Sequence, residues 1–133
     1  MNDSIAERAY VGLGNLYKNN GEYSKAIVYF QKSIKANEFR KDTIRLGGTL
    51  ASLAQLYVEK GENAKARKQI QKVFSLLQHQ KESIPYLIAL HTLANIELSE
   101  KKFSKAIDLD KTGILIAEKM ESEKAMVTFQ DNL

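Results

Sequence analysis

The chain has 133 residues, of which 44% are hydrophobic and 27% charged, and its net charge is +4. This length suits one domain rather than two, and the composition is typical of a folded protein rather than a disordered one. The chain has no apolar run long enough to span a membrane, so we expect no membrane insertion, and no charged-then-apolar leader appears in the given sequence. The absence of cysteine excludes disulfides and thiolate chemistry. It leaves the compartment open, and a soluble, cytoplasmic protein is slightly favoured.

The N-terminal part of the chain predicts a pair of helices. Its apolar residues recur three and four positions apart, which is the period of one side of an α-helix. The first helix is expected to start near Asp3 or Ser4, which are both favourable N-caps, and to run to about Asn20. Gly21 then stands where a left-handed residue would end the helix, and a second helix is expected over 22–37.

The same pattern returns twice, forty residues further along each time. Leu13, Leu53 and Leu93 coincide at this spacing. The other coinciding sets are Gly14, Ala54 and Ala94; Leu16, Leu56 and Ile96; and Ala26, Ala66 and Ala106. A repeat of this length predicts a solenoid of stacked helix pairs. We therefore expect one all-α domain over residues 1–133, without strands, with repeats at about 3–38, 42–79 and 82–121 and a partial fourth repeat or capping helix at about 122–133.

The later repeats carry their own start and stop signals. Gly61 repeats the turn glycine, and Asp42 and Ser83 each precede the apolar run of a new pair. Pro85, the only proline, falls in the first turn of the fifth expected helix, where its missing N–H does no damage.

These residues resemble the tetratricopeptide repeat, and the resemblance covers nearly the whole chain. The family pattern has an aromatic residue, Leu-Gly and Tyr on the first helix, and a small residue and an aromatic on the second. The first copy matches it at Tyr10, Leu13, Gly14, Tyr17, Gly21, Tyr23, Ala26 and Phe30. The third copy departs from it, because Glu97 replaces the tyrosine and Lys101 replaces the turn glycine. The period of forty looks like the long-repeat variant of the family, since the usual period is about 34.

The C-terminal segment is apolar on one side. Its apolar residues are Ala125, Met126, Val127 and Phe129, and Leu133 falls on the register of Leu13. We expect 122–133 to form a helix that docks on the third pair and leaves an apolar outer face, which would allow a homo-oligomer to form through this terminal helix. Two readings stay open: a piece of a longer array, or a short protein with a helical cap.

The resemblance implies a concave face lined by the first helix of each pair, where repeat proteins generally bind. The family's groove positions fall here on Arg8, Val11, Asn15 and Lys18; on Ala51, Gln55 and Val58; and on Ile88, His91, Asn95 and Leu98. Three amides, Asn15, Gln55 and Asn95, occupy one equivalent position. Because a side-chain amide both donates and accepts, this row is expected to hold the backbone of an extended peptide while apolar neighbours select its side chains. The alternative is that the amides only solvate the surface.

The sequence does not favour the clamp with which some family members grip the C-terminal carboxylate of heat-shock chaperones. That clamp requires lysines and an arginine around Asn15. The residues at the matching positions are Val11, Ser52, Ile88 and Thr92. The groove is therefore expected to be half apolar and nearly neutral.

The segment from Asp108 to Gly113 (DLDKTG) looks like the aspartyl-phosphate motif of haloacid dehalogenases and cation-pumping ATPases. In those enzymes the first aspartate is a nucleophile at the end of a buried strand, beside magnesium. Here the motif falls in a helical segment, so we expect no catalytic site. An acid at Asp110 and a glycine at Gly113 should instead weaken the helix and make the third pair the loosest.

Histidines and basic residues give no strong signal of a metal or nucleic-acid site. His79 and His91 are too few for a metal cluster, although His91 could line the groove as a pH-sensitive contact. One second helix carries the basic cluster Lys65, Arg67, Lys68 and Lys72. Since no stacking aromatic accompanies it, we interpret it as a solvated convex face. No cofactor, metal or nucleic acid is expected.

The sequence therefore predicts a non-catalytic module that binds an extended peptide or partner helix in its concave groove. We expect it to be the sensing or scaffolding part of a larger signalling or regulatory protein. The alternative is a self-assembly module that uses its apolar terminal helix. A third hypothesis, an enzyme built on Asp108 or Asp110, would require magnesium-dependent phosphatase activity, which we expect to be absent.

Overall fold

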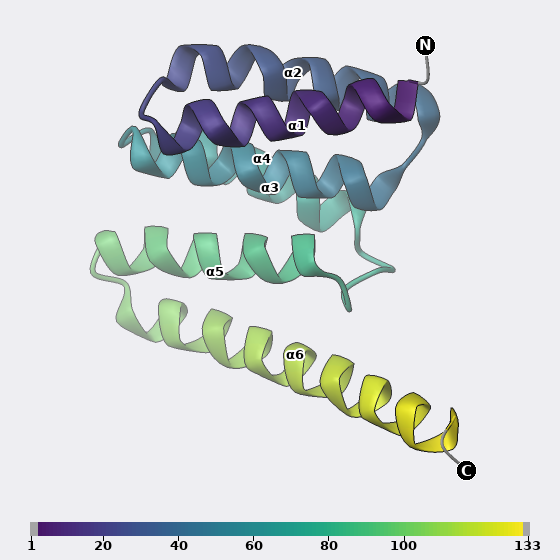
Figure 1. The fold of residues 1–133 in the computed structure, drawn as a ribbon. Coiled ribbons are helices and arrows are strands. Elements are labelled where there is room, and N and C mark those ends of the chain that lie inside the picture. The colour runs from purple at the N-terminus through teal and green to yellow at the C-terminus, as the bar shows by residue number, and fades with distance from the viewer. Residues whose placement is uncertain (1–2, 132–133) are drawn as a thin grey trace.

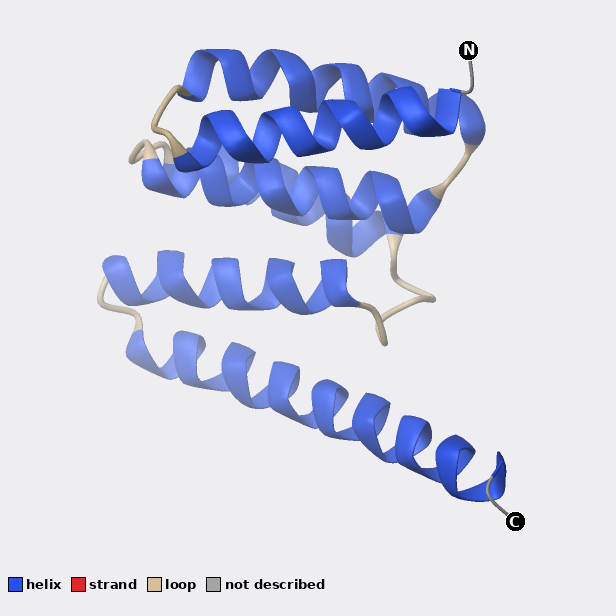
Figure 2. Cartoon of the chain, in the orientation of Figure 1, coloured by secondary structure: helices blue, strands red, loops and turns tan. Residues whose placement is uncertain are grey.

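The computed structural model describes the backbone of residues 3–131 and the side chains of residues 5–124. Its helices are α1 (Asp3–Asn19), α2 (Tyr23–Arg40), α3 (Thr43–Glu59), α4 (Asn63–Leu76), α5 (Ile84–Ser99) and α6 (Phe103–Asp131). Neighbouring helices pack in pairs, α1 with α2, α3 with α4 and α5 with α6, and the pairs stack in chain order (Figure 1). The described residues contain helices and short connections but no strand (Figure 2). The predicted all-α solenoid of helix pairs is confirmed.

The turn inside each pair has the same hydrogen bonds in all three repeats. In the first, the N–H of Glu22 donates to the carbonyl of Tyr17 at 2.9 Å, which closes the helix around Gly21. Gly21 and Gly61 have φ values of 78° and 79°, as their spacing predicts. Lys101 takes the same place with φ 62°. The third turn therefore keeps the geometry without the residue that adopts it most easily.

The first helices of the second and third repeats start where the polar residues predict. The side chain of Asp42 caps α3 by accepting a hydrogen bond of 3.1 Å from the N–H of Arg45. Ser83 precedes α5, but its hydroxyl donates back to the carbonyl of Gln80 and does not cap the helix. Pro85 lies in the first turn of α5, where no N–H is required.

Small residues bring the two helices of each pair together. Ala26, Ala54 and Ala66 are fully buried, and Ala94 is nearly so. Large side chains fill the spaces between them: Phe30, Leu56, Ile70 and Ile96 are also fully buried. The repeated alternation of small and large residues is therefore the packing pattern of the core.

The expected separate helix at 122–133 does not form, because α6 continues from Phe103 to Asp131 without a break. The sequence between Gly113 and Asp131 contains neither glycine nor proline, so nothing ends the helix at 121. The third pair thus consists of a helix of 16 residues and one of 29. The expected apolar contacts of residues 125–133 lie outside the described side chains.

Candidate functional site

A hollow of about 460 Å³ opens between the N-terminal parts of α1, α3 and α5. Its apolar wall is formed by Val11 from α1 and by Ile84, Pro85 and Ile88 from α5. Gly48 of α3 carries no side chain that would fill the space, and an added Cβ there would lie 3.8 Å from Pro85. The hollow is therefore open to solvent on one side and has the size and lining to accept an aliphatic side chain.

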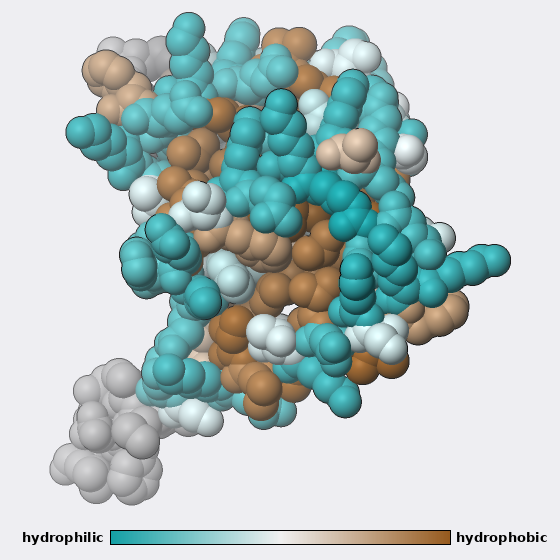
Figure 3. All heavy atoms as spheres, turned by 180° about the vertical axis from the view of Figure 1, so that it is seen from behind, coloured by the Kyte–Doolittle hydropathy of each residue, from teal (hydrophilic) through white to brown (hydrophobic). Residues whose placement is uncertain are grey.

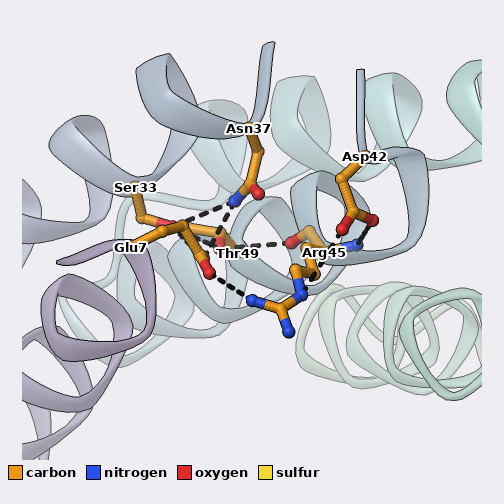
Figure 4. A network of polar contacts seen from close by, with 6 residues as sticks. All are labelled: Glu7, Ser33, Asn37, Asp42, Arg45 and Thr49. Atoms are coloured by element: carbon orange, nitrogen blue, oxygen red, sulfur yellow. Dashed lines mark hydrogen bonds and ion pairs between the residues drawn. The ribbon is translucent and has the colours of Figure 1, made fainter. Parts of the chain in front are cut away.

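Polar side chains next to the hollow form a network of hydrogen bonds and ion pairs (Figure 4), and Glu7, Arg45 and Thr49 of this network also line the hollow. The carboxylate of Glu7, which is 2% exposed, accepts hydrogen bonds from Ser33 at 3.0 Å, Asn37 at 2.9 Å and Arg45 at 2.8 Å. The hydroxyls of Ser33 and Thr49 lie 2.9 Å apart. Because these residues come from α1, α2 and α3, the network fixes the first helix pair on the second.

Of the two arginines that line the hollow, the network leaves only one available to a ligand. Arg45 contacts two acids, Glu7 at 2.8 Å and Asp42 at 3.4 Å, so its charge is balanced within the chain. Arg8 lines the hollow, is exposed, and has no hydrogen bond or ion pair with another described residue. Arg8 is thus the charge that remains available at the rim.

The predicted amide row lies further along the same three helices. Asn15 is half-buried, Asn95 is exposed, and neither side-chain amide is bonded to another described residue. Gln55 lies between them on α3 and accepts a hydrogen bond of 3.4 Å from the ammonium group of Lys18, so its own NH₂ group stays free. The row therefore retains most of its donors and acceptors for a partner.

The other predicted groove residues do not share one environment. Ala51 is fully buried in the core, so it offers no surface to a ligand, and the structure removes it from the set. Val58 is partly buried against the same core. Leu98 is 53% exposed. The ring of His91 is exposed and turned towards α6, where its Nδ1 lies 3.1 Å from Oδ1 of Asp110.

The basic cluster on α4 is not wholly a solvated face, because Arg67 points to the next repeat. Its guanidinium forms an ion pair with Glu97 of α5, which is 4% exposed, and with Glu100. These contacts raise the pKa of Arg67, and the hydrogen bond from Arg67 lowers the pKa of the Glu97 carboxyl against the effect of burial. Arg67 therefore links the second repeat to the third, a role that the sequence pattern did not predict.

The remaining motifs show no assembled site. Asp108 lies within α6, and its carbonyl accepts a hydrogen bond from the Thr112 hydroxyl at 3.0 Å. No group of three or more His, Cys, Asp or Glu side chains in the described part of the chain could hold a metal ion. Among the described residues, no helix combines the length and apolarity needed to cross a bilayer.

Apolar residues reach the surface on the face of the molecule that Figure 3 shows. Seen from behind, apolar residues gather in the hollowed middle of the surface and hydrophilic residues border them (Figure 3). Such a surface is typical of a site that meets another molecule.

Comparison with known proteins gives one match. Residues 7–39 match the family model of the tetratricopeptide repeat, and this range contains most of α1 and α2. No curated protein and no solved structure matches the chain. The matched repeat recurs in register in the two following helix pairs, and repeats of this kind mediate interactions between proteins. The first helix pair therefore matches a tetratricopeptide repeat, and the two helix pairs that follow stack on it in chain order.

Proposed function

We propose that this chain is a non-catalytic module that binds an extended peptide across α1, α3 and α5, and that it is the sensing or scaffolding part of a larger signalling or regulatory protein. The observation that carries the proposal is the pair of free amides, Asn15 and Asn95, on either side of Gln55. Unpaired amides in one row match the repeating donors and acceptors of a peptide backbone.

The spacing of the row suits an extended chain. Packed helices lie about 8–10 Å apart, and an extended peptide advances about 3.3 Å per residue. Each amide would therefore meet about every third residue of a peptide that crosses the first helices. This arrangement supports recognition of the backbone, which is independent of the ligand's sequence.

Selectivity would come from the hollow near Arg8. Asn15 is seven residues beyond Arg8 on α1, and seven helical residues advance about 10 Å. The hollow is therefore within reach of the same peptide. Its wall of Val11, Pro85 and Ile88 would accept an aliphatic side chain, and Arg8 would bind a nearby carboxylate. The ligand class that fits is an extended peptide with an aliphatic residue close to an acidic one.

The test is a peptide array in which aliphatic and acidic positions are varied systematically, probed with the 133-residue chain and with Asn15→Ala/Asn95→Ala. We expect the wild-type chain to select aliphatic–acidic peptides and the double variant to lose most of this binding. The matched control is Gln31→Ala/Gln71→Ala, which removes two exposed amides from the second helices α2 and α4 and should leave binding unchanged. Binding that survives loss of the amide row would exclude the groove as the site.

Arg8→Gln separates the two parts of the proposal. It should remove the preference for acidic peptides and retain binding through the amide row. A preference that is the same in wild type and Arg8→Gln would show that the rim charge does not contact the ligand.

A further inference from the structure

The helix α3 contains two consecutive glycines, Gly47 and Gly48, and the packing of the helices requires only the first of them. A Cβ built on Gly47 would lie 2.8 Å from Cδ1 of Leu77, which is fully buried, so no side chain fits there. A Cβ built on Gly48 would meet only Pro85, at 3.8 Å, which is an ordinary van der Waals contact. Because glycine inside a helix is less stable than alanine, helix packing does not account for Gly48.

Gly48 occupies the middle one of three equivalent positions that line the hollow. Arg8 on α1 and Ile88 on α5 stand at the same register, forty residues before and after it, and both carry long side chains. The hollow of about 460 Å³ therefore lies where the second repeat has no side chain between those of the first and the third. Gly48 is itself partly exposed, so the backbone of α3 can be reached from the hollow.

The groups that line the hollow favour an apolar side chain of the ligand at this point. The carboxylate of Glu7 already accepts a hydrogen bond from Arg45 at 2.8 Å, and the hydroxyl of Thr49 already lies 2.9 Å from that of Ser33. These polar groups therefore need no partner from a ligand. The rest of the wall is largely apolar and includes Ile84, which is 60% exposed. An aliphatic side chain would remove this apolar surface from water.

We propose that Gly48 determines which side chain of the ligand the hollow accepts. Without a side chain at position 48, an aliphatic side chain of the ligand can enter between Arg8 and Ile88 as far as the backbone of α3. A larger residue at position 48 would fill the same space from within the chain. This inference rests on the proposed function, because the ligand is the same extended peptide, and it identifies the residue that makes the hollow selective.

Two substitutions at Gly48 fill the hollow to different extents. Gly48→Ala adds one methyl group, and Gly48→Leu adds an isobutyl group. Side chains on a helix lean towards its N-terminus, so the leucine would extend towards Arg45, which also lines the hollow. We therefore expect Gly48→Ala to weaken the selection of aliphatic peptides and Gly48→Leu to abolish it.

The first measurement separates a role of Gly48 in folding from a role in binding. In urea denaturation, Gly48→Ala should have a midpoint at or above that of the wild type, since the methyl group has room and alanine favours a helix. The matched control is Gly12→Ala on α1, where an added Cβ would also have room and which does not line the hollow. A lower midpoint for Gly48→Ala than for the wild type would show that the fold requires the glycine, and would overturn the proposal.

The second measurement compares two peptides: the most tightly bound aliphatic–acidic peptide of the array, and the same peptide with alanine at its aliphatic position. The wild type and Gly12→Ala should bind the first about tenfold more tightly than the second. Gly48→Leu should bind both equally and keep the preference for an acidic residue, which depends on Arg8. An unchanged ratio in Gly48→Leu, or loss of the acidic preference as well, would overturn the proposal.

A small probe tests the hollow without a peptide, so that failure of this inference can be told apart from failure of the proposed function. N-acetylleucine methylamide is titrated to millimolar concentrations while the methyl NMR signals of Val11, Ile84 and Ile88 are followed. These signals should shift in the wild type and in Gly12→Ala, and should stay constant in Gly48→Leu. Equal shifts in the wild type and Gly48→Leu, or no shift in either, would overturn the inference even where peptides bind. Shifts in the wild type without any binding of peptides would support the hollow and overturn the proposed function.

Discussion

The aromatic ring of Phe30 occupies the space that a side chain on Gly14 would need. A Cβ built on Gly14 would lie 2.5 Å from two ring carbons of Phe30, and the ring is fully buried. Gly14→Ala should therefore lower the free energy of unfolding by about 1–3 kcal/mol, although alanine favours a helix. Urea denaturation of both proteins measures the difference.

The control for this substitution is Gly12→Ala on the same helix. Gly12 has no atom within 4 Å of an added Cβ, so the change should raise the free energy of unfolding by up to about 1 kcal/mol. Equal effects of the two substitutions would contradict the close packing at Gly14.

The buried carboxylate of Glu7 predicts a second effect on stability. Glu7→Gln replaces an acceptor by an NH₂ group that faces the donors of Ser33, Asn37 and Arg45. We expect a loss of about 1–3 kcal/mol in the free energy of unfolding, because a buried donor is left without a partner. Arg8→Gln, one residue along and exposed, should change stability by less than about 0.5 kcal/mol. Similar losses in the two variants would show that the network does not stabilise the contact between the first and second repeats.

The ion pair between Arg67 and Glu97 predicts a dependence on acid. Since Arg67 lowers the pKa of Glu97 in the folded chain, the unfolded state binds the proton more tightly. The stabilisation is complete above the ordinary glutamate pKa of about 4.3 and is lost as the pH falls through the lowered value. Unfolding free energies of wild type and Glu97→Gln should therefore converge between neutral pH and about pH 3. A constant difference over this range would refute the role of Glu97.

The left-handed turn at Lys101 predicts a stabilising substitution. Lys101 has φ 62° at the place where Gly21 and Gly61 stand in the other repeats. Lys101→Gly should raise the free energy of unfolding by about 1 kcal/mol, because glycine adopts this conformation without steric cost. Gly61→Lys is the inverse change and should lower stability by a similar amount. Thermal and urea denaturation check both, and effects of the same sign would be unexpected.

Gly113 predicts that α6 can be strengthened. Its added Cβ would meet only Leu90, at 4.0 Å, so Gly113→Ala has room and should stabilise the helix by about 1 kcal/mol. Hydrogen exchange of α6 amides should slow in the variant. In the wild type we expect α6 to exchange faster than α2 or α4, which tests the expectation that the third pair is the loosest.

Local structure could be predicted because the same types of residue recur at equivalent positions of the repeats. The positive φ values of Gly21 and Gly61 and the burial of Ala26 and Ala66 follow from residues that recur at one register. Local rules for turns and helix packing are sufficient at such positions. The pattern could not show that Leu16 is 67% exposed, because Leu56 and Ile96 stand at the same register and are fully buried.

The polar network was missed because a single glutamate on a helix usually points to water. A signal was nevertheless available. The positions equivalent to Glu7 carry Gly47, which is buried, and Leu87, which is half-buried. A charged residue at a register that is otherwise small or apolar indicates a buried charge with partners. The same reasoning applies to Glu97, which stands where the other repeats have Tyr17 and Tyr57.

The contact between the first and second repeats differs in chemistry from the contact between the second and third. Because of this difference, the fold depends on the order of the repeats. If the second and third repeats were exchanged, every small residue would keep its register. Glu7 would then face Pro85 in place of Arg45, and Ser33 would face Ala89 in place of Thr49. A buried carboxylate would lose its cation, at a cost larger than most single substitutions. The repeats are therefore alike in backbone but not interchangeable, because the side chains at the contacts between them determine their order.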